Sequence, residues 1–173
     1  TKAVATIEAD KAHGLVICPR AMDIAIEKAK KVGIGAVTIH NSTHAGMMAY
    51  HAMRAMPHDM IGYAITGGGA VMVPTFGAEP RVGAVPHAWA VPAGDMPPFV
   101  LDISSSSVAA NKINLLRRTG ADLLPGLLAG EDGTPLMEAQ DVPETTRLLP
   151  WGSTRELGSH KGYGMAVIGQ VFS

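Results

Sequence analysis

The first forty residues constrain the fold most, because they contain two strand patterns separated by one helix pattern. Residues 4–8 alternate in polarity like a strand, and residues 35–39 form a short apolar run typical of a buried strand. Between them, residues 19–32 show the three- and four-residue spacing of a helix that begins at Pro19 and ends at Gly33. Strands joined by such a helix run parallel, so the pattern predicts a β-α-β unit in an α/β fold.

The remaining chain continues to alternate between helices and strands. The expected elements are a helix over 45–56 closed by Pro57, strands over 60–65 and 99–103, a helix that comes after the serines at 104–107 and runs to about Arg118, and a last helix after 157–161. The glycines at 67–69 are expected in a loop, where positive φ and close approach of a ligand are possible. With 173 residues, 47% of them apolar, the chain is long enough for one domain with a real core.

Composition excludes several functional classes. The net charge is −1 and no basic run occurs, so nothing indicates a nucleic-acid partner. No stretch of about 18 residues is apolar and free of charge, so no membrane span is expected. The single cysteine, Cys18, excludes an internal disulfide and favours a reducing, cytoplasmic location.

His44 is the first candidate for chemistry. It follows the strand predicted over 35–39 and directly precedes the helix predicted over 45–56. A side chain there is held by backbone on both sides and can face a cleft, and an imidazole titrates near neutral pH. His44 is therefore a candidate proton donor or acceptor. A histidine that caps the helix or lies in the interior would fit the same pattern.

Two polar segments precede predicted helices and form a second group of candidates. Residues 101–108 (LDISSSSV) place an aspartate and four serines where a helix is expected to start, which suits a phosphate or carboxylate. An ordinary N-cap uses the same residue types. Residues 158–164 (GSHKGYG) place a histidine and a lysine between glycines, and Lys161 could neutralise an anion. A solvated loop is the alternative for this segment.

The histidine spacing does not predict a metal site. Histidines 44, 51 and 58 recur every seven residues, which on one helix is a rise of about 10.5 Å, too far for two of them to share a metal. His40 and His44 flank a turn and could meet, but a third ligand is not evident. A metal-dependent hydrolase using these two histidines stays open as an alternative. The Gly-x-Gly-x-x-Gly fingerprint of Rossmann folds is absent.

Five short motifs occur in order along nearly the whole chain: residues 33–35 (GIG), 41–46 (NSTHAG), 73–77 (VPTFG), 98–106 (PFVLDISSS) and 158–164 (GSHKGYG). Together they resemble the type-2 malate/L-lactate dehydrogenases, a family that includes ureidoglycolate, sulfolactate and diketogulonate dehydrogenases and cyclic-imine carboxylate reductases. The chain departs from the family at residues 66–68 (TGG), where Thr-Asn-Ser is usual, and at 83–87 (GAVPH), which replaces Gly-Thr-Asn-Pro. The first departure removes two polar side chains near the expected nicotinamide.

The resemblance implies a mixed-sheet, non-Rossmann NAD(P)-binding domain of the sulfolactate/malate dehydrogenase type. It implies an oxidoreductase that moves a hydride between NAD or NADP and a 2-hydroxy acid or 2-oxo acid, such as malate or lactate, without a metal. His44 would give or take the proton. The implied cofactor-binding residues are Gly68, Asp102, Ser104, Ser105, Ser106, His160, Lys161 and Gly162.

The resemblance also implies an oligomeric state and a domain organisation. Family members are usually homodimers, and they carry an N-terminal helical segment and a C-terminal continuation that do not appear in residues 1–173. We therefore expect a single NAD(P)-binding and catalytic domain that is an internal piece of a longer protein. A catalytically incomplete nucleotide-binding module of the same fold is the alternative function.

Overall fold

A computed structural model describes residues 1–173, and the chain divides into two compact units. Unit 1 comprises residues 1–66 and 87–103, and unit 2 comprises residues 67–86 and 104–173. Each unit has its own buried apolar cluster.

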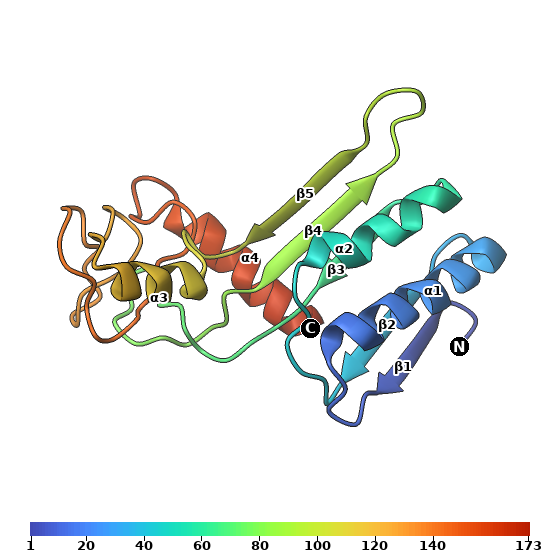
Figure 1. The fold of residues 1–173 in the computed structure, drawn as a ribbon, viewed down its shortest axis with the longest axis horizontal. Helices are drawn as coiled ribbons and strands as arrows, with labels where there is room; N and C mark the ends of the chain where they lie inside the picture. Colours follow the sequence, from blue (N-terminus) through green and yellow to red (C-terminus); the bar gives the residue numbers. More distant parts are fainter. The chain divides into compact units, whose positions relative to one another are not determined.

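The first half of unit 1 is the predicted β-α-β unit (Figure 1). Strands β1 (Val4–Glu8) and β2 (Ala36–His40) pair in parallel, with Val4 opposite Ala36 and Glu8 opposite His40. Helix α1 (Gly14–Val32) connects them and packs on both strands. The parallel pairing predicted from the sequence is therefore confirmed.

The start of α1 differs from the prediction, which placed Pro19 at the first helical position. The helix begins at Gly14, because His13 caps it by accepting the Leu15 N–H at Nδ1, at 3.3 Å. Pro19 lies inside the helix, where its missing N–H removes one intrahelical hydrogen bond without ending the helix. The predicted end is confirmed, since Gly33 adopts a φ of 85° and donates its N–H to the Ala29 carbonyl.

The second half of unit 1 holds a short helix and most of a three-stranded sheet. Helix α2 (Met48–Ala52) continues into the 3-10 helix η1 (Met53–His58). Strands β3 (Gly62–Ile65), β4 (Pro86–Val91) and β5 (Phe99–Ser104) follow in the order β3-β4-β5, with β3 and β4 antiparallel. The helix predicted over 45–56 starts later because Gly46 has a φ of 74°, outside the helical region.

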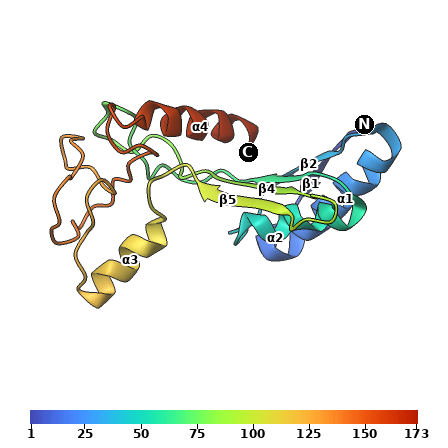
Figure 2. The same cartoon turned by 90° about the horizontal axis from the view of Figure 1, so that it is seen from above.

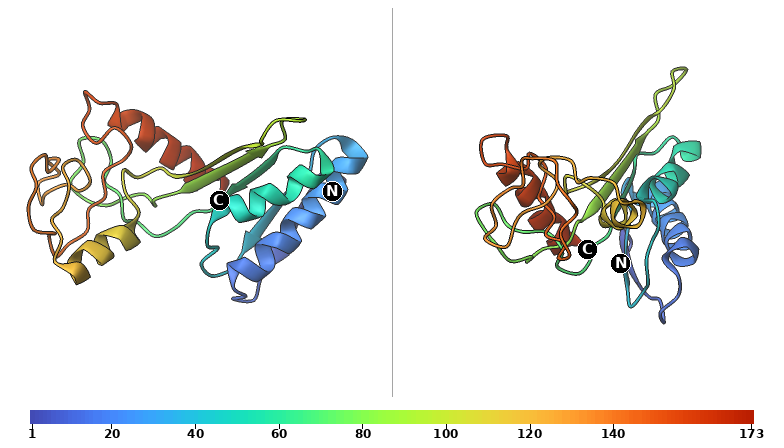
Figure 3. Two further views of the ribbon diagram at one scale, coloured as in Figure 1. Left: turned by 45° about the horizontal axis from the view of Figure 1, so that its top comes forward. Right: turned by 60° about the vertical axis from the view of Figure 1, so that its left-hand side comes forward.

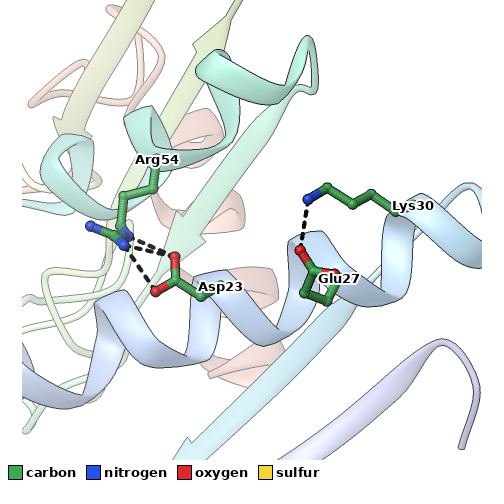
Figure 4. A network of polar contacts seen from close by, with 4 residues as sticks. All are labelled: Asp23, Glu27, Lys30 and Arg54. Atoms are coloured by element: carbon green, nitrogen blue, oxygen red, sulfur yellow. Dashed lines mark hydrogen bonds and ion pairs between the residues drawn. The ribbon is translucent and has the colours of Figure 1, made fainter.

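Helix α1 and the α2–η1 segment lie side by side (Figures 1 and 3). An ion pair joins them, in which the Arg54 guanidinium of η1 donates three hydrogen bonds of 2.7–3.0 Å to the Asp23 carboxylate of α1 (Figure 4). Both side chains are partly exposed, so the pair contributes at most about 1 kcal/mol to stability. The buried alanines and Met48 between α2 and the sheet form the core of this unit.

Unit 2 contains helices α3 (Ala110–Thr119) and α4 (Ser159–Phe172), which Figure 2 shows on opposite sides of its long loops. Its core is formed by Met72, Val108, Ile113, Leu123, Leu128, Leu148 and Ala166. Residues 122–142 are loop-rich and are tied down by isolated bridges such as Leu123 to Gln140. The predicted last helix is also confirmed.

The serines at 104–107 precede α3, as predicted, but none of them caps it. The helix begins at Ala110, and its N-cap is Ala109, which makes no side-chain cap. Ser106 and Ser107 instead bond backbone carbonyls, at Val108 and Pro150. None of the helices combines the length and apolar character that a bilayer crossing requires.

Candidate functional site

The loop that carries His44 in unit 1 is held against α1. The backbone N–H of Thr43 donates to the carbonyl of Ala12 at 3.2 Å. A Cβ added to Gly14 would lie 2.4 Å from the Cα of Ala45 and 2.8 Å from the carbonyl oxygen of His44. Only glycine lets the start of α1 approach the loop this closely.

The His44 side chain is exposed, and its Nδ1 accepts a hydrogen bond from the Gly46 N–H at 3.1 Å. The neutral ring in this arrangement therefore carries its hydrogen on Nε2. His44 is neither an interior residue nor the N-cap of α2, because Met47 occupies the cap position. The arrangement leaves Nε2 available for proton exchange with a ligand.

Asp102 lies on β5 and bonds the start of α2 rather than α3. Its Oδ2 accepts the backbone N–H of Ala49 at 2.7 Å. A carboxylate at the first turn of a helix satisfies a free N–H and interacts favourably with the helix dipole. The other oxygen, Oδ1, has no hydrogen-bond partner within the protein, and the residue is exposed. The structure thus brings Asp102 to the helix that follows the His44 loop.

In unit 2, the predicted serines form a chain of hydroxyl contacts. Ser106 donates to the Val108 carbonyl at 2.8 Å, and its oxygen lies 2.7 Å from the Ser104 hydroxyl. Ser105 is held through its backbone, which donates to Val85 and accepts from Trp151, both at 3.1 Å. Its Oγ is fully buried and has no hydrogen-bond partner. Such an atom is rare in folded proteins and indicates a missing polar partner.

The start of α4 packs against the same tryptophan. A Cβ on Gly162 would lie 2.4 Å from the backbone nitrogen of Trp151, so this position admits no side chain. Since Trp151 also bonds Ser105, its backbone lies between the two predicted polar segments. The structure therefore brings Ser105 and Gly162 to one place in unit 2, although they are far apart in the sequence.

Positive charge gathers at the start of α4. His160 and Lys161 are exposed in its first turn, and the Arg155 guanidinium donates to Nδ1 of His160 at 3.1 Å. One carboxylate, Glu156, is nearby in sequence, and hydrogen bonds from its own backbone N–H and from the Thr154 hydroxyl lower its pKa. Lys161 and Arg155 supply the positive charge here, which suits an anion, whereas the N–H groups of Ser159 and Lys161 already donate to the carbonyls of Thr154 and Gly158.

Gly68 lies in an exposed loop of unit 2, as predicted. A Cβ on Gly68 would meet no atom within 4 Å, so the space beside it is open. The glycines at 67–69 do not use the positive φ that is open to them. The loop of Gly68 lies close to Gly83, because a Cβ added to Gly83 would be 2.9 Å from the carbonyl oxygen of Gly68.

The sequence analysis did not single out Trp151, Arg155 or the contact between Thr75 and Ser159, whose hydroxyl oxygens lie 3.1 Å apart. The sequence did offer a signal for them: a tryptophan, which occurs only twice in the chain, and an arginine lie shortly before the 158–164 motif. No three His, Cys, Asp or Glu side chains gather closely enough to hold a metal ion. His40 instead pairs with Glu8, at 2.8 Å.

Comparisons with known proteins give one consistent result. A model of the family described as malate/L-lactate dehydrogenase matches residues 1–173. The malate dehydrogenase of Pyrococcus horikoshii is 38% identical over 98% of this chain and 47% of its own length. The L-sulfolactate dehydrogenase of Methanocaldococcus jannaschii is 35% identical over 99% of this chain and 47% of its own.

Solved structures agree with the sequence comparison. The malate dehydrogenase of Entamoeba histolytica superimposes with a TM-score of 0.90, at 29% identity, over 100% of this chain and 50% of that one. The chain thus spans about half the length of the relatives it matches.

Proposed function

Because the chain belongs to the malate/L-lactate dehydrogenase family, we propose that it contributes the cofactor-binding and proton-transfer residues of a hydroxy-acid dehydrogenase. The reaction transfers a hydride between NAD or NADP and a malate- or lactate-like 2-hydroxy acid or 2-oxo acid. The relatives named for malate and sulfolactate support this substrate class, since both compounds carry a hydroxyl beside a carboxylate. Residues 1–173 act together as one NAD(P)-binding and catalytic domain in this proposal.

The observation that carries the proposal is the convergence of the serine segment and the α4 start on Trp151. Ser105 anchors the serine segment to Trp151 through its backbone, while its side chain is fully buried. Ser104 and Ser106 supply further hydroxyls, and Asp102 offers a free carboxylate oxygen suited to a ribose hydroxyl. A bound nicotinamide cofactor supplies or accepts the hydride.

The α4 start is assigned to the charged part of the cofactor. The exposed cations Lys161 and Arg155 at this helix start, with His160 beside them, suit a pyrophosphate. Gly162 lets the helix pack directly on Trp151, and Gly68 leaves open space beside its loop. These features support binding of NAD and NADP alike, because both carry the pyrophosphate.

His44 is assigned to proton transfer. In the reduction of a 2-oxo acid, the protonated imidazole gives a proton to the oxygen that becomes the alkoxide; in the reverse direction it takes the proton back. The charged ring carries hydrogen on both nitrogens, so the bond from Gly46 to Nδ1 belongs to the neutral ring and opens when His44 is charged. We also propose a homodimer, as the family resemblance implies.

The test is an assay of the full-length gene product on a panel of 2-oxo acids with NADH and with NADPH. A nicotinamide fluorescence titration runs beside it, with ADP-ribose as a competitor that lacks the nicotinamide. We expect saturable turnover on at least one malate- or lactate-like acid. Tight cofactor binding without turnover on any acid would instead favour a nucleotide-binding module.

A further inference from the structure

His51 is a buried histidine that the proposed reaction does not use. It lies in α2, is 2% exposed, and belongs to the seven-residue histidine series of the sequence. Its Nε2 lies 2.8 Å from the carbonyl oxygen of Ala45. Because a carbonyl oxygen can only accept, Nε2 carries a hydrogen and donates it.

The other ring nitrogen of His51 fixes the form of the ring. Nδ1 is buried and has no hydrogen-bond partner. A hydrogen on it would be a buried donor without an acceptor, which costs more than a buried lone pair in the same place. The geometry therefore corresponds to the neutral ring with its hydrogen on Nε2, a fixed donor aimed at the loop.

The carbonyl that His51 holds directly follows His44. Two contacts fix the backbone at this point: the His51 bond to Ala45, and the close packing of Gly14 on the His44–Ala45 peptide. The third contact, from Gly46 to Nδ1 of His44, depends on the charge of His44 and is lost when the ring is protonated. The bond from His51 does not depend on that charge, so it persists through a proton transfer.

We propose that His51 is a positioning residue, whose Nε2–H holds the Ala45 carbonyl and thereby keeps the His44 imidazole in place while its protonation changes. The inference rests on the proton-transfer role proposed for His44. It assigns to α2 a function beyond packing, because an apolar residue of the same size would fill the space without holding the loop.

Two amide substitutions separate the hydrogen bond from packing. In His51→Gln the side-chain nitrogen stands at the position of Nε2 and can still donate to Ala45, whereas in His51→Asn it stands at the position of Nδ1 and falls short. We expect His51→Asn in the full-length protein to lower kcat on a 2-oxo acid by about 10- to 100-fold, with an unchanged Kd for NAD(P)H. We expect His51→Gln to retain most of the wild-type kcat.

Ile26→Ala is the matched control for lost stability, since Ile26 is a buried residue in the middle of α1. It should unfold at a lower temperature and keep the wild-type kcat under conditions where it is folded. Equal kcat losses in His51→Asn and His51→Gln, or an equal loss in Ile26→Ala, would show that His51 is structural only.

The second readout is the imidazole nitrogen spectrum of protein labelled with 15N-histidine. We expect the His44 signals to show an accepting Nδ1 and a protonated Nε2 in the wild type and in His51→Gln, and averaged tautomers in His51→Asn. Unchanged His44 signals in His51→Asn would overturn the inference. If His44→Ala keeps wild-type turnover, the proposed role of His44 fails, and the spectrum alone decides whether His51 positions the ring.

Discussion

At the scale of single residues, contacts with backbone groups of other segments fix the positions of the candidate side chains. His44 accepts from Gly46, its loop is bonded to Ala12, and its peptide packs on Gly14. Asp102 depends on a contact with Ala49, 53 positions away in the sequence. The backbone N–H and carbonyl of Ser105 are both hydrogen-bonded, and its side chain is fully buried. Each of these features gives a direct test.

Replacing His44 by alanine should lower turnover on a 2-oxo acid by about 10²- to 10⁴-fold, the usual contribution of a general acid. The Kd for the cofactor should stay close to wild type, because His44 is assigned to proton transfer and not to cofactor binding. His40→Ala is the control, since His40 is an exposed histidine paired with Glu8. Wild-type turnover in His44→Ala would refute the assignment.

Asp102→Ala and Ser106→Ala should each weaken NAD(P)H binding more than they slow the chemical step. The reason is that both remove a polar group from the segment assigned to the cofactor. Ser106→Ala also breaks the hydroxyl chain between Ser104 and the Val108 carbonyl. Fluorescence titration gives the Kd, and single-turnover kinetics gives the chemical step. Unchanged dissociation constants in both variants would remove these residues from the site.

At the scale of elements, glycines decide how closely helices and strands approach. Gly33 and Gly35, separated by Ile34, follow the end of α1 and serve different purposes. Gly33 has a φ of 85° and open space around its Cβ position, whereas a Cβ on Gly35 would lie 1.9 Å from the carbonyl oxygen of Ala25. The first glycine is needed for its conformation and the second for close packing of α1 against the chain that enters β2.

Gly33→Ala should therefore cost about 1 kcal/mol of unfolding free energy, from the strained φ alone. Gly35→Ala should cost about 3 kcal/mol or more, because helix backbone has to move. Urea unfolding followed by circular dichroism measures both. Similar losses in the two variants would contradict the distinction between conformation and packing.

At the scale of the whole molecule, the chain spans about half the length of its relatives. The family resemblance implies an N-terminal helical segment that does not appear in residues 1–173. We therefore expect residues 1–173 expressed alone to turn over at least about 10²-fold more slowly than the complete gene product, because orientation supplies much of the barrier reduction. Equal turnover numbers under identical conditions would show that these residues are sufficient.

The sequence by itself determined the parallel β-α-β unit, the end of α1 at Gly33, and the fold class. The family match and the structural likeness confirm the mixed α/β fold of the sulfolactate/malate dehydrogenase type. These features follow from local pattern: period-3.6 and period-2 spacing, and a glycine where positive φ is needed. The order of short motifs was enough for the family, because five of them recur in a fixed sequence.

Only the tertiary structure decided where the candidate side chains lie. Asp102 and the serines predict one helix start, yet Asp102 caps α2 while Ser106 and Ser107 bond loop carbonyls. Capping residues satisfy whichever free N–H the fold brings near, and sequence proximity does not determine which one. The role of Trp151 between Ser105 and Gly162, and the bond from His51 to Ala45, likewise depend on contacts between segments that no local pattern encodes.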